Sequence, residues 1–174
     1  MKNALIVVDM QNDFVDGALG FEGAQKVIPV ITQKIKAARK SDTRVIFTMD
    51  THYDDYLETV EGDHLPVPHG IEGTHGHALV EAINALKKAA DPVFKKPTFP
   101  SLDLANYLKQ EGYEHVELCG LVSSMCVISN AVMAKAALPN AKIVVDATAT
   151  TTFDSTFQTQ TLSMLTHLHI DVIE

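Results

Sequence analysis

Short apolar runs alternate with amphipathic segments along the chain. Six runs are rich in β-branched and aliphatic residues and have the length of buried parallel strands: 4–9, 44–50, 91–96, 115–120, 142–147 and 169–174. Apolar residues at helical spacing predict helices at 24–40, 77–89, 102–110, 126–138 and 155–167. This alternation predicts an α/β fold with one doubly wound, six-stranded, mainly parallel sheet, flanked by helices on both faces, in a single domain over 1–174.

Two stretches, 10–23 and 51–76, fit neither period. Long irregular segments in compact α/β domains are usually functional loops, and the ligand site of such a sheet lies beyond the carboxyl ends of its strands. The sequence puts Asp9, Asp50 and Lys96 at the ends of the first three predicted strands, and the turn 120–126 follows the fourth. We therefore expect two acids, a base and a thiol on one rim of the sheet.

Composition narrows the function classes. The chain carries 14 Lys+Arg against 22 Asp+Glu, a formal charge of −8, and no basic run, so nucleic-acid binding is not expected. The longest apolar runs have only strand length, which argues against a membrane partner. The start of the chain lacks the pattern of a secretory signal, and two cysteines do not make a disulfide framework. We expect a cytoplasmic protein.

Cys126 stands just past a buried strand, where a predicted helix begins and a thiolate would be stabilised. Attack on an amide carbonyl also needs a proton acceptor, a role suited to Asp9, and Lys96 would favour both anions. Backbone N–H groups of the turn before Cys126 could receive the oxyanion. A small buried hydrophobe is the alternative interpretation of Cys126. Cys119, inside an apolar strand, is expected to be inert core.

The 50–69 loop suggests a metal site. Asp50 and His52 are spaced i, i+2, so an extended backbone points both side chains to one side, and His69 could return from the far end of the loop. Two imidazoles and a carboxylate suit Zn²⁺, or less selectively Mn²⁺ or Fe²⁺. Further candidate ligands, each of which could equally be a solvated loop side chain, are Glu58, Glu61, Asp63, His64 and His75.

Three motifs resemble those of the nicotinamidase and isochorismatase-like cysteine hydrolases: "IVVDMQNDF" (6–14), "FKKPTFPS" (94–101) and "CGLVSSMCVISNA" (119–131). The similarity runs from residue 4 to the last strand. It implies a Rossmann-like fold with a catalytic triad of Cys126, Asp9 and Lys96. It also implies a non-proline cis peptide at Leu121–Val122, which would aim the Val122 and Cys126 N–H groups at the oxyanion.

The resemblance is greatest to the metal-binding, nicotinamidase-type branch. It assigns Asp50, His52 and His69 as metal ligands, with Glu61 the nearest match to an additional acidic ligand in some members. The family commonly forms homo-oligomers, and we expect one here.

The substrate pocket departs from the family pattern. The chain has no Trp, and Pro66 stands where family members commonly have an aromatic residue. Ser124 stands two positions before Cys126, where family members often have an acidic residue. The candidate substrate contacts are Phe14, Phe99 and Leu65.

The candidate triad and metal ligands, together with this resemblance, predict a metal-containing cysteine amidohydrolase. It would cleave a small, nicotinamide-like primary carboxamide to the carboxylate and ammonia through a Cys126 thioester. The same triad could instead serve another small amide or a ureido (carbamoyl) substrate. Less favoured alternatives are isochorismatase-like hydrolysis, which would leave the metal set without a task, and a non-catalytic metal-binding protein on this fold. Redox function lacks a nearby resolving cysteine.

Overall fold

A fully parallel sheet forms the centre of the molecule. The computed structural model describes residues 1–174 and contains six strands in the order β3-β2-β1-β4-β5-β6, with every neighbouring pair parallel. The strands are β1 (Asn3–Val8), β2 (Thr43–Asp50), β3 (Val93–Lys96), β4 (His115–Leu121), β5 (Lys142–Thr151) and β6 (Asp171–Ile173). The predicted doubly wound α/β fold is confirmed, and the sheet is wholly rather than mainly parallel.

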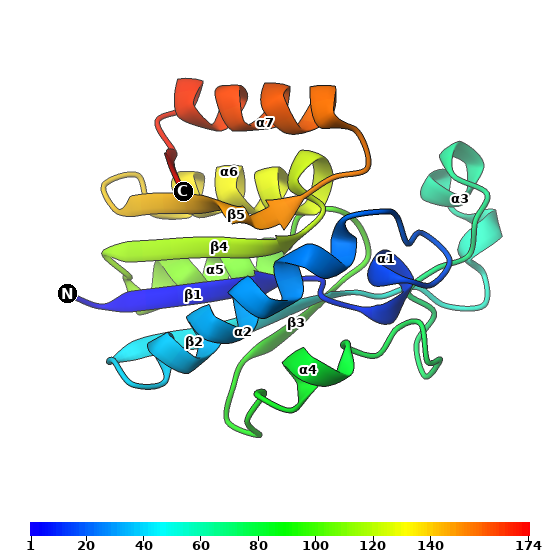
Figure 1. Cartoon of the computed structure of the whole chain (residues 1–174), viewed down its shortest axis with the longest axis horizontal. Coiled ribbons are helices and arrows are strands. Elements are labelled where there is room, and N and C mark those ends of the chain that lie inside the picture. Colours follow the sequence, from blue (N-terminus) through cyan, green and yellow to red (C-terminus); the bar gives the residue numbers. More distant parts are fainter.

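Helices cover both faces of this sheet (Figure 1). They are α1 (Asn12–Val15), α2 (Val27–Ala38), α3 (Val60–His64), α4 (Glu81–Asn84), α5 (Leu102–Glu111), α6 (Ile128–Ala137) and α7 (Ser155–His167). α2 and α4 pack into the core on one face, whereas α5, α6 and α7 pack into the core on the other. None of the helices combines the length and apolarity that crossing a bilayer requires.

The two cores explain why the strands read as uninterrupted apolar runs. In β1, Ala4, Ile6 and Val8 belong to the core on one face, and Leu5 and Val7 belong to the core on the other. Successive side chains of a strand point to opposite faces, so a strand with helices on both sides must be apolar at every position.

The predicted helix at 77–89 is largely wrong. Only Glu81–Asn84 is α-helical, although Leu79, Val80 and Ile83 are buried as the apolar pattern required. A buried irregular segment can place apolar residues in a core at the same spacing as a helix. The predicted helix at 126–138 also differs, because a π-helical turn at Ser123–Val127 precedes α6.

The order of the strands determines where a functional site can form. β1 lies between β2 and β4, so the chain moves outward in opposite directions from this point, and the loops after these strands diverge to leave a crevice. In Figure 1 the strands run towards the side of the molecule that carries α1 and α3. The ends of β1, β2, β3 and β4 are therefore the positions from which functional side chains converge.

Candidate active site and metal centre

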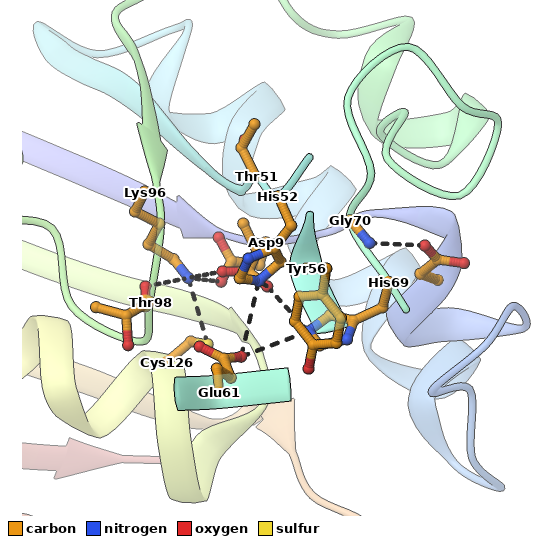
Figure 2. Close-up of polar contacts among 12 residues, drawn as sticks. Asp9, Thr51, His52, Tyr56, Glu61, His69, Gly70, Lys96, Thr98 and Cys126 are labelled. Atoms are coloured by element: carbon orange, nitrogen blue, oxygen red, sulfur yellow. Dashed lines mark hydrogen bonds and ion pairs between the residues drawn. The ribbon is translucent and has the colours of Figure 1, made fainter. Parts of the chain in front are cut away.

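Lys96, the last residue of β3, contacts several of the converging side chains (Figure 2). Its Nζ atom is 2.6 Å from Asp9 Oδ2, 3.1 Å from Asp50 Oδ1 and 3.5 Å from Cys126 Sγ. It also donates a 3.1 Å hydrogen bond to the carbonyl oxygen of Thr98. The side chain is fully buried, and the surrounding anions raise the pKa of its ammonium group against the opposing effect of burial. Lys96 is therefore a permanent cation between two carboxylates and a thiol.

Asp9 is held directly after β1 by its neighbour in β2. Thr48 Oγ1 donates a 2.6 Å hydrogen bond to Asp9 Oδ1, and Asp9 has a φ of 45°, a left-handed conformation that non-glycine residues rarely adopt. Complete burial raises the pKa of the Asp9 carboxyl, and the ammonium of Lys96 offsets only part of this rise. A carboxylate with a raised pKa is suited to accept and return a proton.

Cys126 lies within the π-helical turn and is 6% exposed. Burial raises the pKa of its thiol well above the ordinary value, Lys96 opposes this rise in part, and the nearby Asp9 adds to it. Burial therefore opposes the free thiolate that the start of a helix was expected to stabilise. Asp9 is the adjacent group that could accept the proton of the Cys126 thiol.

The turn before Cys126 has an unusual backbone. The Leu121–Val122 peptide is cis, in agreement with the expectation from the family resemblance. Gly120 precedes it with a φ of 118°, and a Cβ at this position would lie 2.1 Å from the Val8 carbonyl oxygen. Only glycine allows β4 to approach β1 so closely before the turn. Val122 and Cys126 both line the cavity described below.

Four side chains form a cluster of metal-ligating groups beside this turn: Asp50, His52, Glu61 and His69. Their ligand atoms all lie within 4.8 Å of one another. His52 Nε2 and His69 Nε2 are 3.1 and 3.3 Å from Asp50 Oδ2, and 3.7 and 3.6 Å from Glu61 Oε1 (Figure 2). Two imidazoles and two carboxylates are a suitable donor set for Zn²⁺. The other predicted candidates from this region, Glu58, Asp63, His64 and His75, are exposed and outside the cluster.

Neighbouring groups fix the orientation of these candidate ligands. His69 donates from Nδ1 to the Val67 carbonyl, 2.8 Å away, which turns Nε2 towards Asp50 and Glu61. The Gln11 amide bridges to β2, because it accepts from the Asp50 N–H at 2.7 Å and donates to the Asp50 carbonyl at 2.9 Å. The backbone of Asp50 and the imidazole of His69 are thus both held by groups outside the cluster.

A cavity of about 340 Å³ joins the thiol to the metal cluster. Its 13 lining residues are Phe14, Ala18, Leu19, Gly20, Phe21, Asp50, Glu61, His69, Phe99, Val122, Met125, Cys126 and Phe153. A second, more open hollow of about 720 Å³ lies on the other side of Glu61 and Phe99, which line both spaces, and His52 faces this outer hollow.

The expected substrate contacts are only partly among these lining residues. Phe14 and Phe99 line the cavity, but Leu65 does not. Leu65 lies just after α3, where its carbonyl accepts a 2.8 Å hydrogen bond from the Tyr56 hydroxyl. The sequence reasoning missed Phe21 and Phe153, two aromatic side chains that meet edge to face with ring centroids 6.4 Å apart. Phe21 carried a usable signal, since it is an aromatic residue in the irregular segment 10–23.

The chain is similar to two proteins named as nicotinamidases, one of them as a probable inactive one. A nicotinamidase/pyrazinamidase from Mycobacterium tuberculosis is 29% identical over 175 residues, covering 88% of this chain and 89% of the relative. A probable inactive nicotinamidase from Arabidopsis thaliana is 28% identical over 167 residues, covering 87% of this chain and 82% of the relative.

Solved structures show the same fold over the full length. The Bacillus subtilis nicotinamidase has a TM-score of 0.88 and 28% identity, and covers 100% of both chains. The N-carbamoylsarcosine amidase from Thermoplasma acidophilum has a TM-score of 0.81 and 26% identity, covering 100% of this chain and 96% of its own. The pyrazinamidase of Pyrococcus horikoshii, a complex with zinc, has a TM-score of 0.87 at 23% identity and covers 100% of this chain and 99% of its own.

The isochorismatase domain family model matches residues 3–174. This match covers all six strands and the convergent side chains at their ends. The chain therefore belongs to the isochorismatase family, as a hydrolase of its nicotinamidase-like group.

Proposed function

We propose that this protein is a metal-containing cysteine amidohydrolase that converts a small, uncharged, nicotinamide-like carboxamide to its carboxylate and ammonia. The observation that carries the proposal is the position of the Lys96 ammonium, which contacts both Asp9 and Cys126 at the inner end of a cavity walled by the metal cluster. A thiol, a proton acceptor with a raised pKa and a fixed cation are the groups that amide cleavage by cysteine requires.

Acylation begins when Asp9 takes the thiol proton of Cys126 and the sulfur attacks the amide carbonyl carbon. Lys96 balances the negative charge that moves between carboxylate and sulfur during this transfer. As the tetrahedral intermediate collapses, the C–N bond breaks and Asp9 returns the proton to the leaving nitrogen, which departs as ammonia. A thioester on Cys126 remains.

Deacylation repeats the proton transfers with water. Asp9 accepts a proton from a water molecule as its oxygen attacks the thioester carbon, and the C–S bond then breaks. The sulfur recovers this proton through Asp9, and the carboxylic acid that has formed loses its remaining proton to solvent and leaves as the carboxylate. In both steps the N–H groups of Val122 and Cys126 are the proposed donors to the oxyanion, a type of contact that contributes about 3–4 kcal/mol per donor in other hydrolases.

The donor set of Asp50, His52, Glu61 and His69 fits a divalent ion, for which Zn²⁺ is the first choice and Mn²⁺ or Fe²⁺ are alternatives. A bound ion would supply Lewis acidity and an attachment point for a ring nitrogen or other donor atom of the substrate. The zinc in the Pyrococcus horikoshii pyrazinamidase complex supports this assignment.

The lining of the cavity has no lysine or arginine side chain that could bind a substrate carboxylate. The cavity wall carries two acids, Asp50 and Glu61, and neither Lys nor Arg. The chain has only two arginines, Arg39 and Arg44, and they bind Asp91 and the Ala90 carbonyl outside the cavity. Isochorismate and carbamoyl amino acids carry carboxylates, which would meet no cationic side chain on this wall. A neutral aromatic amide suits the phenylalanine-rich wall better.

The direct test is release of ammonia by the zinc-loaded protein from nicotinamide, pyrazinamide, a neutral ureido compound and N-carbamoylsarcosine. We expect turnover of the neutral aromatic amides, loss of turnover in Cys126→Ala, and wild-type turnover in the matched control Cys119→Ala. Absence of activity on every amide would favour a non-catalytic protein, and preference for N-carbamoylsarcosine would contradict the proposed substrate class. Unimpaired turnover by Cys126→Ala would contradict the mechanism itself.

A further inference from the structure

The buried side chain of Asn130, in the first turns of α6, connects three separate parts of the site. Its Nδ2 atom donates to the Cys126 carbonyl at 2.8 Å and to the Phe99 carbonyl at 3.0 Å, and its Oδ1 atom accepts from the Ser101 N–H at 3.0 Å. The two carbonyls need a donor and the N–H needs an acceptor, so only one orientation of the amide satisfies all three groups. Asn130 is 1% exposed.

The segment held by this amide follows Lys96 directly. Thr98 supplies the carbonyl that accepts from the Lys96 ammonium, and Phe99 forms part of the wall between the cavity and the outer hollow. Phe99 is 39% exposed, so side-chain packing alone holds it weakly. The segment ends at Ser101, whose hydroxyl caps α5 by accepting from the Leu104 N–H.

We infer that Asn130 is a positioning residue that holds the Lys96–Ser101 segment and the Cys126 turn in one fixed geometry. It ties the backbone of the nucleophile to the backbone of the segment carrying the cation and the aromatic wall. Without the amide, the Cys126 carbonyl and the Ser101 N–H would lose a buried hydrogen bond, and the Phe99 carbonyl a partly buried one. The segment could then shift relative to the sulfur. The inference rests on the proposed function where it concerns turnover.

Two substitutions distinguish the hydrogen bonds from Asn130 to Phe99 and Ser101 from its hydrogen bond to the Cys126 carbonyl within the helical segment. Asn130→Ala removes all three hydrogen bonds. Asn130→Ser shortens the side chain, but a serine hydroxyl in a helix can still donate to the carbonyl four residues earlier, here that of Cys126. We expect both variants to lower kcat/KM by about tenfold to 100-fold, because displacements of about 1 Å have effects of this size. Both should also slow alkylation of Cys126 by iodoacetamide at pH 7.5 by at least threefold.

Ser101→Ala is the matched control. It removes the hydroxyl that caps α5 but keeps the backbone N–H that binds Asn130. We expect this variant to unfold more easily than wild type while its kcat/KM and alkylation rate stay within twofold of wild type. A purely structural role for Asn130 would instead leave both rates unchanged in Asn130→Ser and Asn130→Ala despite lower melting temperatures, and this result would overturn the inference.

The rate of Cys126 alkylation tests the positioning role of Asn130 whether or not the protein is an amidohydrolase. If wild type turns over no amide but Cys126 is alkylated more slowly in both Asn130 variants, the proposed function fails and the positioning role stands. If wild type is active and Asn130→Ser keeps its kcat/KM and alkylation rate, the positioning role fails and the proposed function stands.

Discussion

The ammonium nitrogen of Lys96 lies 2.6 Å from Oδ2 of Asp9, and neither side chain exposes any surface to solvent. Removing two charges from water costs several kcal/mol per ion, which their mutual attraction often fails to recover. Asp50 adds a second carboxylate to the same ammonium. A protein selected for stability alone would do as well with apolar residues here, so this pair is better explained by chemistry than by folding.

Asp9→Asn tests the role of the carboxylate as proton acceptor. A neutral amide of the same shape cannot take the thiol proton, so we expect kcat for nicotinamide to fall by about 10²–10⁴-fold. The fold should survive, because Lys96 keeps its contacts with Asp50 and the Thr98 carbonyl. Thr48→Val is the matched control: it removes a hydrogen bond to Asp9 but keeps the charge, and should have a much smaller effect. Equal losses in the two variants would contradict the assigned role.

Glu61→Gln tests the fourth candidate ligand. An uncharged amide is a poor ligand for Zn²⁺, so we expect zinc affinity to fall by at least about tenfold. Competition with a chromophoric chelator gives this value without reference to activity. Glu58→Gln, an exposed position two residues before α3, is the control and should bind zinc as wild type does. Unchanged affinity in Glu61→Gln would restrict the metal set to Asp50, His52 and His69.

Gly120→Ala tests the close approach of β4 to β1. The new Cβ would lie 2.1 Å from the Val8 carbonyl oxygen in a left-handed backbone conformation, so we expect a loss of more than about 4 kcal/mol in the free energy of unfolding, or no folded protein. Gly112 also has a positive φ, of 67°, but a Cβ added there would meet no atom within 4 Å. Gly112→Ala should therefore cost only about 1–2 kcal/mol. Urea denaturation distinguishes the two, and similar losses would contradict the steric argument.

The ion pair between Asp91 and Arg39 should make stability depend on pH. Burial alone would raise the pKa of Asp91, but the Arg39 guanidinium and the Lys88 N–H outweigh it and hold the pKa below its ordinary value. A carboxyl whose pKa is lower in the folded state stabilises the protein above its unfolded pKa of about 4, and this contribution is lost as pH falls through the folded value.

Asp91→Asn should therefore reduce the free energy of unfolding by about 1–3 kcal/mol at pH 7, and by progressively less below pH 4. Thermal denaturation across this pH range provides the measurement, and Asp42→Asn, at an exposed position, provides the control. A difference from wild type that stays constant down to pH 2 would show that the charge of Asp91 is not the cause.

The sequence was informative where a local pattern has only one three-dimensional outcome. A parallel strand buried on both faces must be apolar throughout, and this pattern identified β1 and β4 in the sequence. The carboxyl ends of parallel strands meet at one edge of the sheet, so Asp9 and Lys96 could be predicted to lie close together. The segment 77–89 misled because Leu79 and Ile83 reach the core from a mostly irregular backbone.

Other features depend on contacts between distant segments. Thr48 and Asn130 act through hydrogen bonds to residues 39 and 31 positions away, for which no local pattern exists. The sequence also does not display the burial of Cys126, which opposes the nearby cation in setting the pKa of the thiol. Cytoplasmic location and homo-oligomer formation stay predictions.

The metal cluster is accessible from the outer hollow as well as from the inner cavity. His52 and Glu61 border that hollow, whereas Cys126 borders only the inner cavity. An ion held by the cluster would therefore remain reachable by a small chelator even while an acyl group occupies the space above the sulfur. Covalent blocking of the thiol by a small reagent that has no donor atom for the ion should therefore leave removal of the ion through the outer hollow possible.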